Sequence, residues 1–210
     1  MIGAGLGLVL SAVQSGFEEF QSDLANYVPQ LFATWSQEEQ SQITAYFSQT
    51  QTPVYFSIGF TMQPNAFPQV SVTLGPASEE QNSDPFGMTL AKPEPVMDSA
   101  GKVVQYQLFQ GVVMHDRYDL EIRHPTNQKV LLWLDIIARW ALIQQRQSLL
   151  QQGFLTQVIS ASGVQPDPFY SANGSMPIFL RTVSLTVKHN VGYYTTADPI
   201  TAITSTVTAG

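Results

Sequence analysis

The sequence has 210 residues, no cysteine, and a formal net charge of −7 at pH 7. The lack of cysteine excludes disulfide bonds, thiolate metal sites, iron–sulfur clusters and cysteine nucleophiles. Only 12% of the residues are charged, against about 25% in an ordinary soluble protein. We therefore expect partners to cover much of the surface of this chain.

The charges are unevenly distributed along the sequence. The first basic residue is Lys92, so residues 1–91 carry a net charge of −8. Affinity for nucleic acid comes largely from Lys and Arg, and the acidic half therefore argues against sequence-specific DNA binding. It fits a surface past which DNA slides without binding, or one that docks on a basic partner. A simple contribution to solubility is the alternative interpretation.

The first segment predicts an amphipathic helix that ends at Pro29. Its apolar residues follow one another at alternating intervals of four and three, which is the seam of such a helix. We expect the seam to pack on the parent domain, with a coiled coil as the alternative. A second predicted helix, 36–49, begins at a capping box formed by Ser36 and Glu39. The seam consists of Leu6, Leu10, Val13, Phe17, Phe20, Leu24 and Tyr27.

The opening Met1–Leu10 is apolar, but it lacks the positive flank of a secretory signal. Its apolar run is also shorter than the ~20 residues that span a bilayer. We expect no transmembrane segment and no membrane partner. A membrane-active protein that inserts Met1–Val13 is the alternative hypothesis.

The next part of the chain predicts strands and one long loop. Apolar and polar residues alternate with a period of two, which is typical of strands with one buried face. Gly75–Pro95 is polar and rich in proline, which predicts a long exposed loop. A turn is expected at Asp98–Gly101. The predicted strands here are 54–60, 70–74, 102–114 and 118–123.

A long helix is predicted from Thr126 or Asn127 to about Gln152, with Gly153 as its stop. It is apolar almost all round between residues 130 and 143. Such a helix needs cover on more than one side, so we expect the sheet on one side and another helix or subunit on the other.

Two charges and two tryptophans stand out on this helix. Asp135 and Arg139 have the spacing of an intrahelical ion pair, and an ion pair between subunits is the alternative. Trp133 and Trp140 lie seven residues apart on one stripe, and we expect them to anchor the helix on the sheet.

The C-terminal part predicts a strand at 154–162, a loop at 163–177, a strand at 178–194 and an extended arm at 195–210. The arm adds to a neighbouring sheet edge in one interpretation and is disordered in the other. The fold class is therefore α+β: an antiparallel sheet backed by a long apolar helix, with an N-terminal amphipathic helix and a C-terminal arm. The predicted divisions are 1–50 (helical), 51–194 (core) and 195–210 (arm).

No catalytic, cofactor-binding or metal-binding site is predicted. The histidines His115, His124 and His189 show none of the short spacings of metal ligands, and no glycine-rich phosphate loop or nucleophile elbow occurs. We read His124, which precedes a proline, as a turn residue. An enzyme with a pocket between the sheet and the Gly75–Pro95 loop is an alternative hypothesis.

The order of these elements, together with residues 130–140, 149–154 and 179–187, is similar to the tail-terminator and neck (head–tail connector) proteins of tailed bacteriophages. The resemblance implies a structural virion protein, not an enzyme, that assembles in the host cytoplasm into a ring, often a hexamer. The implied partners are sister copies and other neck, connector or tail-tube proteins, with DNA passing through the ring. Another phage adaptor or tail protein is the alternative.

The candidate interface combines residues of the N-terminal seam, the ion pair of the long helix and the apolar residues of the arm. These residues are Leu6, Leu10, Val13, Phe17, Asp135, Arg139, Ile200, Ile203 and Val207.

Overall fold

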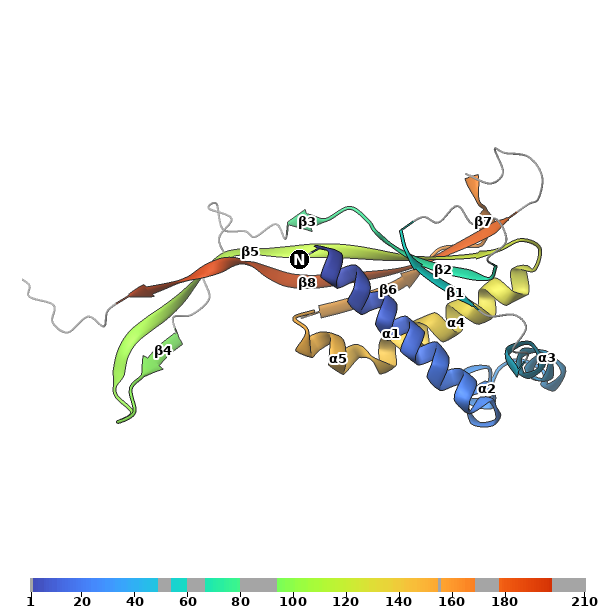
Figure 1. The fold of residues 1–210 in the computed structure, drawn as a ribbon, viewed down its shortest axis with the longest axis horizontal. Coiled ribbons are helices and arrows are strands. Elements are labelled where there is room, and N and C mark those ends of the chain that lie inside the picture. Colours follow the sequence, from blue (N-terminus) through green and yellow to red (C-terminus); the bar gives the residue numbers. More distant parts are fainter. Residues whose placement is uncertain are drawn as a thin grey trace, which may run out of the picture. The chain divides into compact units, whose positions relative to one another are not determined.

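The computed structural model describes residues 2–48, 54–59, 67–79, 94–154, 156–168 and 178–197 (Figure 1). The fold is mixed α+β, as predicted. The chain divides into two compact units, one of residues 1–77 with 116–189 and one of residues 78–115 with 190–210. The helices are α1 (Ile2–Ser22), α2 (Leu24–Leu31), α3 (Gln37–Ser48), α4 (Gln128–Gln144) and α5 (Arg146–Gln151). The strands are β1 (Tyr55–Ile58), β2 (Gln69–Leu74), β3 (Ser78–Glu79), β4 (Glu94–Met97), β5 (Val103–His124), β6 (Thr156–Ala161), β7 (Gln165–Pro166) and β8 (Phe179–Ala197).

The N-terminal segment forms two helices, so the prediction of one helix ending at Pro29 is wrong. The chain breaks at Asp23, whose side chain accepts a hydrogen bond from the Asn26 N–H at 3.2 Å and caps α2. Pro29 lies inside α2. The tyrosine of α2 ties the two helices together, because the Tyr27 hydroxyl donates to the Glu19 carboxylate at 2.7 Å. This hydrogen bond raises the pKa of Tyr27 above its usual value.

The capping box of α3 is confirmed. The Ser36 hydroxyl accepts from the Glu39 N–H at 3.3 Å, and the Glu39 carboxylate accepts from the Ser36 N–H at 3.2 Å. Ile43 and Phe47 of this helix are buried. The reciprocal hydrogen bonds satisfy two backbone donors that the first turn of a helix leaves unpaired.

The sheet of the first unit has the strand order β1-β2-β5-β8-β6. The prediction of an antiparallel sheet is wrong in one respect: the sheet is mixed, because β1 runs parallel to β2. β2 is antiparallel to β5, and β6 is antiparallel to β8. The predicted strands 102–114 and 118–123 form the single strand β5, since the ladder with neighbouring strands continues through the residues between them.

The helices α1 and α4 pack against each other beside this sheet (Figure 1). The core face of the sheet carries apolar side chains such as Val72, Leu120 and Leu185, all fully buried. The alternate residues of the same strands are polar, and they form a second face. Phe17 of α1 meets Phe56 of β1 at 5.4 Å between ring centroids, so α1 belongs to the core of this unit.

The helix predicted to reach Gln152 is divided at Gln145 into α4 and α5. Asn127 is the N-cap, and its side chain accepts from the Lys129 N–H at 3.0 Å. Gly153 follows α5 with a φ of 94°, a value that favours glycine and suits a helix stop. Nine residues of α4 are buried. The predicted helix needs to be buried on a second side as well, and α1 of the same chain covers much of that side.

The tryptophans of α4 have their aromatic partners in helices. The Trp133 ring lies 5.8 Å from that of Tyr46 in α3, and the Trp140 ring lies 4.9 Å from that of Tyr27 in α2. The sequence predicts that both tryptophans anchor α4 on the sheet. In the described part of the chain, however, their ring contacts are with the N-terminal helices. The reason is that α2 and α3 pack across the tryptophan stripe.

The second unit contains a hairpin of β4 and the first part of β5. Asp98 forms the turn: its side chain accepts from the N–H groups of Ala100 and Lys102, both at 2.9 Å. This confirms the predicted turn. The predicted loop 75–95 is interrupted at its ends by β3 and by the start of β4, and the residues between these two strands lie outside the described ranges.

At the C-terminus, β8 continues to Ala197, beyond the predicted end at residue 194. Of the predicted arm, residues 198–210 lie outside the described part of the chain.

Candidate protein interface

The seam residues of α1 divide into two groups. Leu6 and Leu10 are half-buried, whereas Val13 and Phe17 have exposed fractions of 0% and 2%. Val13 and Phe17 are therefore core residues and do not offer a surface to a partner. The alternative of membrane insertion by Met1–Val13 would need Val9 and Val13 at the surface, and both are fully buried.

The carboxylate of Asp135 binds two arginines. Arg139 donates from Nε to Oδ1 at 3.0 Å and from Nη2 to Oδ2 at 2.8 Å, which confirms the intrahelical pair. Arg181 of β8 adds a third contact, from Nη2 to Oδ2 at 2.8 Å. The Asp135 side chain is 1% exposed, and a buried carboxylate needs this degree of compensation. The site therefore fastens α4 to β8, while Arg139 keeps a partly exposed guanidinium.

Sequence reasoning missed Arg181 as a partner of Asp135, because the two residues come from elements far apart in the sequence. The sequence did contain a signal for a second partner. An aspartate in the middle of an apolar helix is expected to be buried, and a single exposed arginine does not compensate a buried carboxylate. The three remaining candidate residues, Ile200, Ile203 and Val207, lie outside the described residues.

A second buried ion cluster lies on the polar face of the sheet. Arg123 of β5 is 3% exposed. Its Nε donates to Asp167 Oδ2 at 2.8 Å, its Nη1 donates to the Ser71 hydroxyl at 2.8 Å, and its Nη2 pairs with the Glu121 carboxylate. Asp167 follows β7 and is 2% exposed. The cluster thus connects β2, β5 and the segment after β7.

A smaller network continues along the same face of β5. Asp119 Oδ1 accepts from Arg117 Nε at 2.8 Å and from the Ser184 hydroxyl of β8 at 2.5 Å. Because the acidic and basic side chains of this face pair with one another, its charges largely cancel. Such a face does not attract phosphate strongly.

The histidines are placed separately. His124 ends β5, and its Nδ1 accepts from the N–H groups of Thr126 and Asn127 at 3.3 and 3.0 Å. It therefore forms the turn that precedes α4, as predicted. Burial lowers the pKa of His124 below its usual 6.5. His115 lies in β5 beside β3, and the backbone of His189 belongs to β8, while its side chain is outside the described part.

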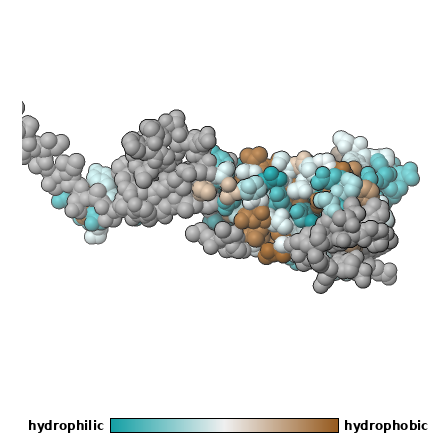
Figure 2. Space-filling model, turned by 90° about the horizontal axis from the view of Figure 1, so that it is seen from above, coloured by the Kyte–Doolittle hydropathy of each residue, from teal (hydrophilic) through white to brown (hydrophobic). Residues whose placement is uncertain are grey.

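Large apolar side chains are exposed on both outer strands of the sheet. On β1 they are Tyr55 and Ile58, with exposed fractions of 42% and 51%, and on β6 it is Val158 with 59%. Ile143, at the end of α4, is 58% exposed. Seen from above, the region of the sheet shows hydrophobic patches set among hydrophilic residues (Figure 2). The two outer strands therefore both expose apolar side chains, and the residues that they expose are different.

The hairpin of the second unit is also apolar and exposed. Val96 and Met97 of β4 and Val104 and Tyr106 of β5 have exposed fractions between 36% and 56%. A two-stranded hairpin is at best marginally stable in water on its own. In the described part of this unit, the hairpin therefore exposes apolar area that its own two strands do not cover.

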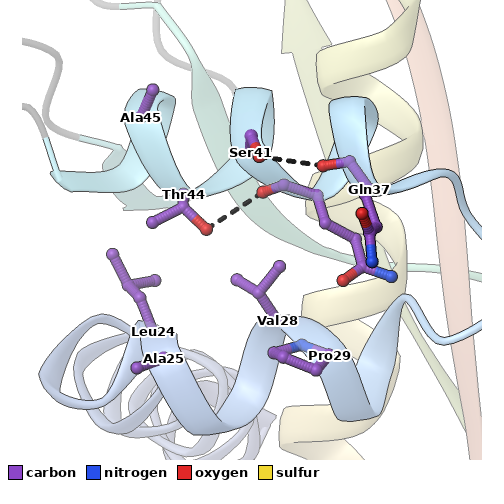
Figure 3. A pocket seen from close by; sticks show the side chains of 9 residues that line it. Leu24, Ala25, Val28, Pro29, Gln37, Ser41, Thr44 and Ala45 are labelled. Carbon is purple, nitrogen blue, oxygen red and sulfur yellow. Dashed lines mark hydrogen bonds between the residues drawn. The ribbon is translucent and has the colours of Figure 1, made fainter.

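A groove of about 520 Å³ lies between α2 and α3 (Figure 3). Leu24, Val28 and Pro29 project into it from α2, and Ser41 and Thr44 line it from α3. Sequence reasoning did not find this groove, because it depends on the break at Asp23 that sets the direction of α2.

Within the described residues, no group of three or more His, Asp or Glu side chains is arranged to hold a metal ion. No helix in the same part of the chain is long and apolar enough to cross a bilayer. The sequence matches no protein-family model and no curated protein.

Proposed function

We propose that this chain is a structural virion protein of a tailed bacteriophage. In this proposal it forms a ring, with six copies as the expected number, at the head–tail junction or the head-proximal end of the tail. The observation that carries the proposal is the exposure of Ile58 on β1 and Val158 on β6, the two outer strands of one sheet. A ring needs two different surfaces on each subunit, because each copy meets its neighbours head to tail.

The charge pattern supports the same role. Residues 1–91 carry only acidic charges, and on the polar face of β5 the charges of Arg117 and Asp119 pair with each other. Neither feature favours tight binding of phosphates, whose affinity depends on unpaired Lys and Arg. DNA passing through such a ring would slide without being held.

The proposal also assigns roles to the C-terminal segment and to α4. In this proposal, the C-terminal segment that follows β8, which lies outside the described residues, adds to a sheet edge of a neighbouring subunit. The helix α4 backs the sheet inside each subunit. The partners are sister copies and other neck, connector or tail-tube proteins, and assembly takes place in the host cytoplasm before the ring enters the virion.

The experiment combines light scattering and electron microscopy with two edge variants, Ile58→Lys and Val158→Lys. The wild-type chain should form ring-shaped particles of one size. Each variant alone should be monomeric, because every head-to-tail contact uses one β1 edge and one β6 edge. A mixture of the two variants should form dimers, because the intact β1 edge of one variant meets the intact β6 edge of the other.

Thr34→Lys on the exposed turn between α2 and α3 is the matched control and should still form rings. Circular dichroism melts check that the variants fold. A wild-type chain that stays monomeric at its highest soluble concentration would contradict the proposal. A twofold dimer that Ile58→Lys abolishes and Val158→Lys leaves intact would contradict it as well.

A further inference from the structure

The groove between α2 and α3 combines an apolar floor with a polar wall (Figure 3). The floor consists of Leu24, Val28 and Pro29 of α2, and Ala45 of α3 extends it. The wall consists of Ser41 and other polar residues of α3. A surface of this kind suits a partner that has both an apolar and a polar side.

Three of the donors in the polar wall are already used within the chain: the hydroxyls of Ser41 and Thr44 and the amide of Gln40. The Ser41 hydroxyl donates to the Gln37 carbonyl at 2.8 Å, and the Thr44 hydroxyl donates to the Gln40 carbonyl at 2.9 Å. The Gln40 amide donates to the carbonyls of Phe32 and Trp35 at 3.0 and 3.2 Å. The two hydroxyls therefore meet a ligand as acceptors, and the amide of Gln37, which also lines the groove, can accept through its oxygen and donate through its nitrogen.

The helix α2, which forms the floor of the groove, adds another acceptor. Pro29 lies inside α2 and has no N–H group, so it cannot donate to the carbonyl of Ala25 as a helical residue normally would. Ala25 and Pro29 both line the groove. A donor brought by a ligand can take the place of the missing helical N–H.

The charges around the groove have one sign. Residues 2–48 contain five acidic residues and no Lys or Arg. Exposed Asp23 directly precedes Leu24, and exposed Glu38 lies one turn before Ser41 on the surface of α3. Among the described residues, α3 forms one ion pair with a basic side chain, between Glu39 and Lys129 of α4 at 3.9 Å. Acceptors inside the groove, together with exposed carboxylates on residues adjacent in sequence to its lining, favour a cationic ligand.

We propose that this groove binds an amphipathic segment of a partner protein that carries Lys or Arg beside apolar residues. The aliphatic stems of the basic side chains lie along Leu24, Val28 and Pro29. Their ammonium or guanidinium groups donate to Ser41, Thr44 and the Ala25 carbonyl, while Asp23 and Glu38 provide the attraction. The proposal does not depend on ring formation, because α2 and α3 bear neither of the sheet edges.

The test measures binding of two synthetic peptides by fluorescence anisotropy to the full chain. One peptide has Leu and Lys at helical spacing, and the other has Glu in place of each Lys. We expect the cationic peptide to bind, and to bind more weakly as salt is added. Ser41→Lys should weaken this binding by about tenfold or more, because it places a like charge in the groove.

Gln42→Lys is the matched control, since it adds the same charge to the next residue of α3, which does not line the groove. It should change the affinity less than twofold (~0.4 kcal/mol). Equal binding of the two peptides would overturn the proposal, because it would show an unselective apolar contact. Equal losses in Ser41→Lys and Gln42→Lys would overturn it too, since they would place the binding elsewhere.

Discussion

Gly16 of α1 lies directly against Ala141 of α4. A Cβ atom added at Gly16 would overlap the Cβ of Ala141 and would lie 2.8 Å from its Cα. The two helices therefore approach each other at a point where only a hydrogen and a methyl group fit between the backbones. This close approach explains how α1 covers an apolar helix that would otherwise need a second subunit.

Gly16→Ala should destabilise the protein, although alanine favours a helix over glycine by about 1 kcal/mol. The overlap with Ala141 forces the helices apart, and overpacking of this kind costs about 1–3 kcal/mol. Urea unfolding would measure the change. Gly7→Ala on the same helix is the control, because nothing lies within 4 Å of its added Cβ, and it should stabilise the chain. Equal effects of the two substitutions would show that the helices do not meet at Gly16.

Trp133→Ala should reduce the free energy of unfolding by about 3–5 kcal/mol. Trp133 is 3% exposed and packs on Tyr46 of α3, so its removal leaves a cavity between α3 and α4. Ile143→Ala on the same helix should change stability by less than about 0.5 kcal/mol, because Ile143 is 58% exposed. Denaturant melts in which Trp133→Ala costs no more than Ile143→Ala would refute this placement.

Arg123→Met should destabilise the fold by about 3–5 kcal/mol, because it removes the guanidinium to which the buried Asp167 carboxylate is bonded. The double variant with Asp167→Leu should recover much of this loss, since the two fully buried charges are then gone and the remaining Glu121 side chain is 24% exposed. A double-mutant cycle in guanidinium chloride measures the coupling between the two positions. Arg117→Met, which alters a side chain that is 43% exposed, should cost far less. If the double variant were less stable than Arg123→Met, the buried pair would not be the cause of the loss.

Protonation of His124 should weaken the fold. Its Nδ1 accepts two backbone N–H groups, and burial holds its pKa in the folded chain below 6.5. The unfolded chain therefore binds the proton first, so this stability is complete above pH 6.5 and is lost as the pH falls through the folded pKa. His124→Asn keeps an acceptor that does not titrate in this range. Thermal melts at several pH values should show a smaller acid-induced loss in the variant, and parallel losses would contradict the assignment.

Much of the local structure could be predicted because its causes are local. Ser36 and Glu39 define a capping box within four residues, Asp98 forms its own turn, and Gly153 takes the backbone conformation of a helix stop. Asp135 and Arg139 could be paired from their spacing alone. These features depend on neighbours in the sequence, and the sequence therefore carries their signal.

The remaining features depend on contacts between distant segments. Arg181 joins Asp135 from another element, and Asp167 joins Arg123 across 44 residues. The parallel pairing of β1 with β2 cannot be read from alternation, which is the same in parallel and antiparallel pairs. The apolar seam of α1 indicated a surface that must be covered, but not that α4 of the same chain covers part of it.

The alternation on β5 restricts how the length of this chain can change. Leu120 and Ile122 face the core, while Glu121 and Arg123 face the opposite side. One residue inserted or deleted between 117 and 120 would shift the register of the residues that follow, so that Arg123 would turn into the core and Leu120 would turn away from it. In homologues of this sequence, insertions and deletions should therefore accumulate at the Asp98–Gly101 turn. At this turn they do not change which residues of β5 face the core.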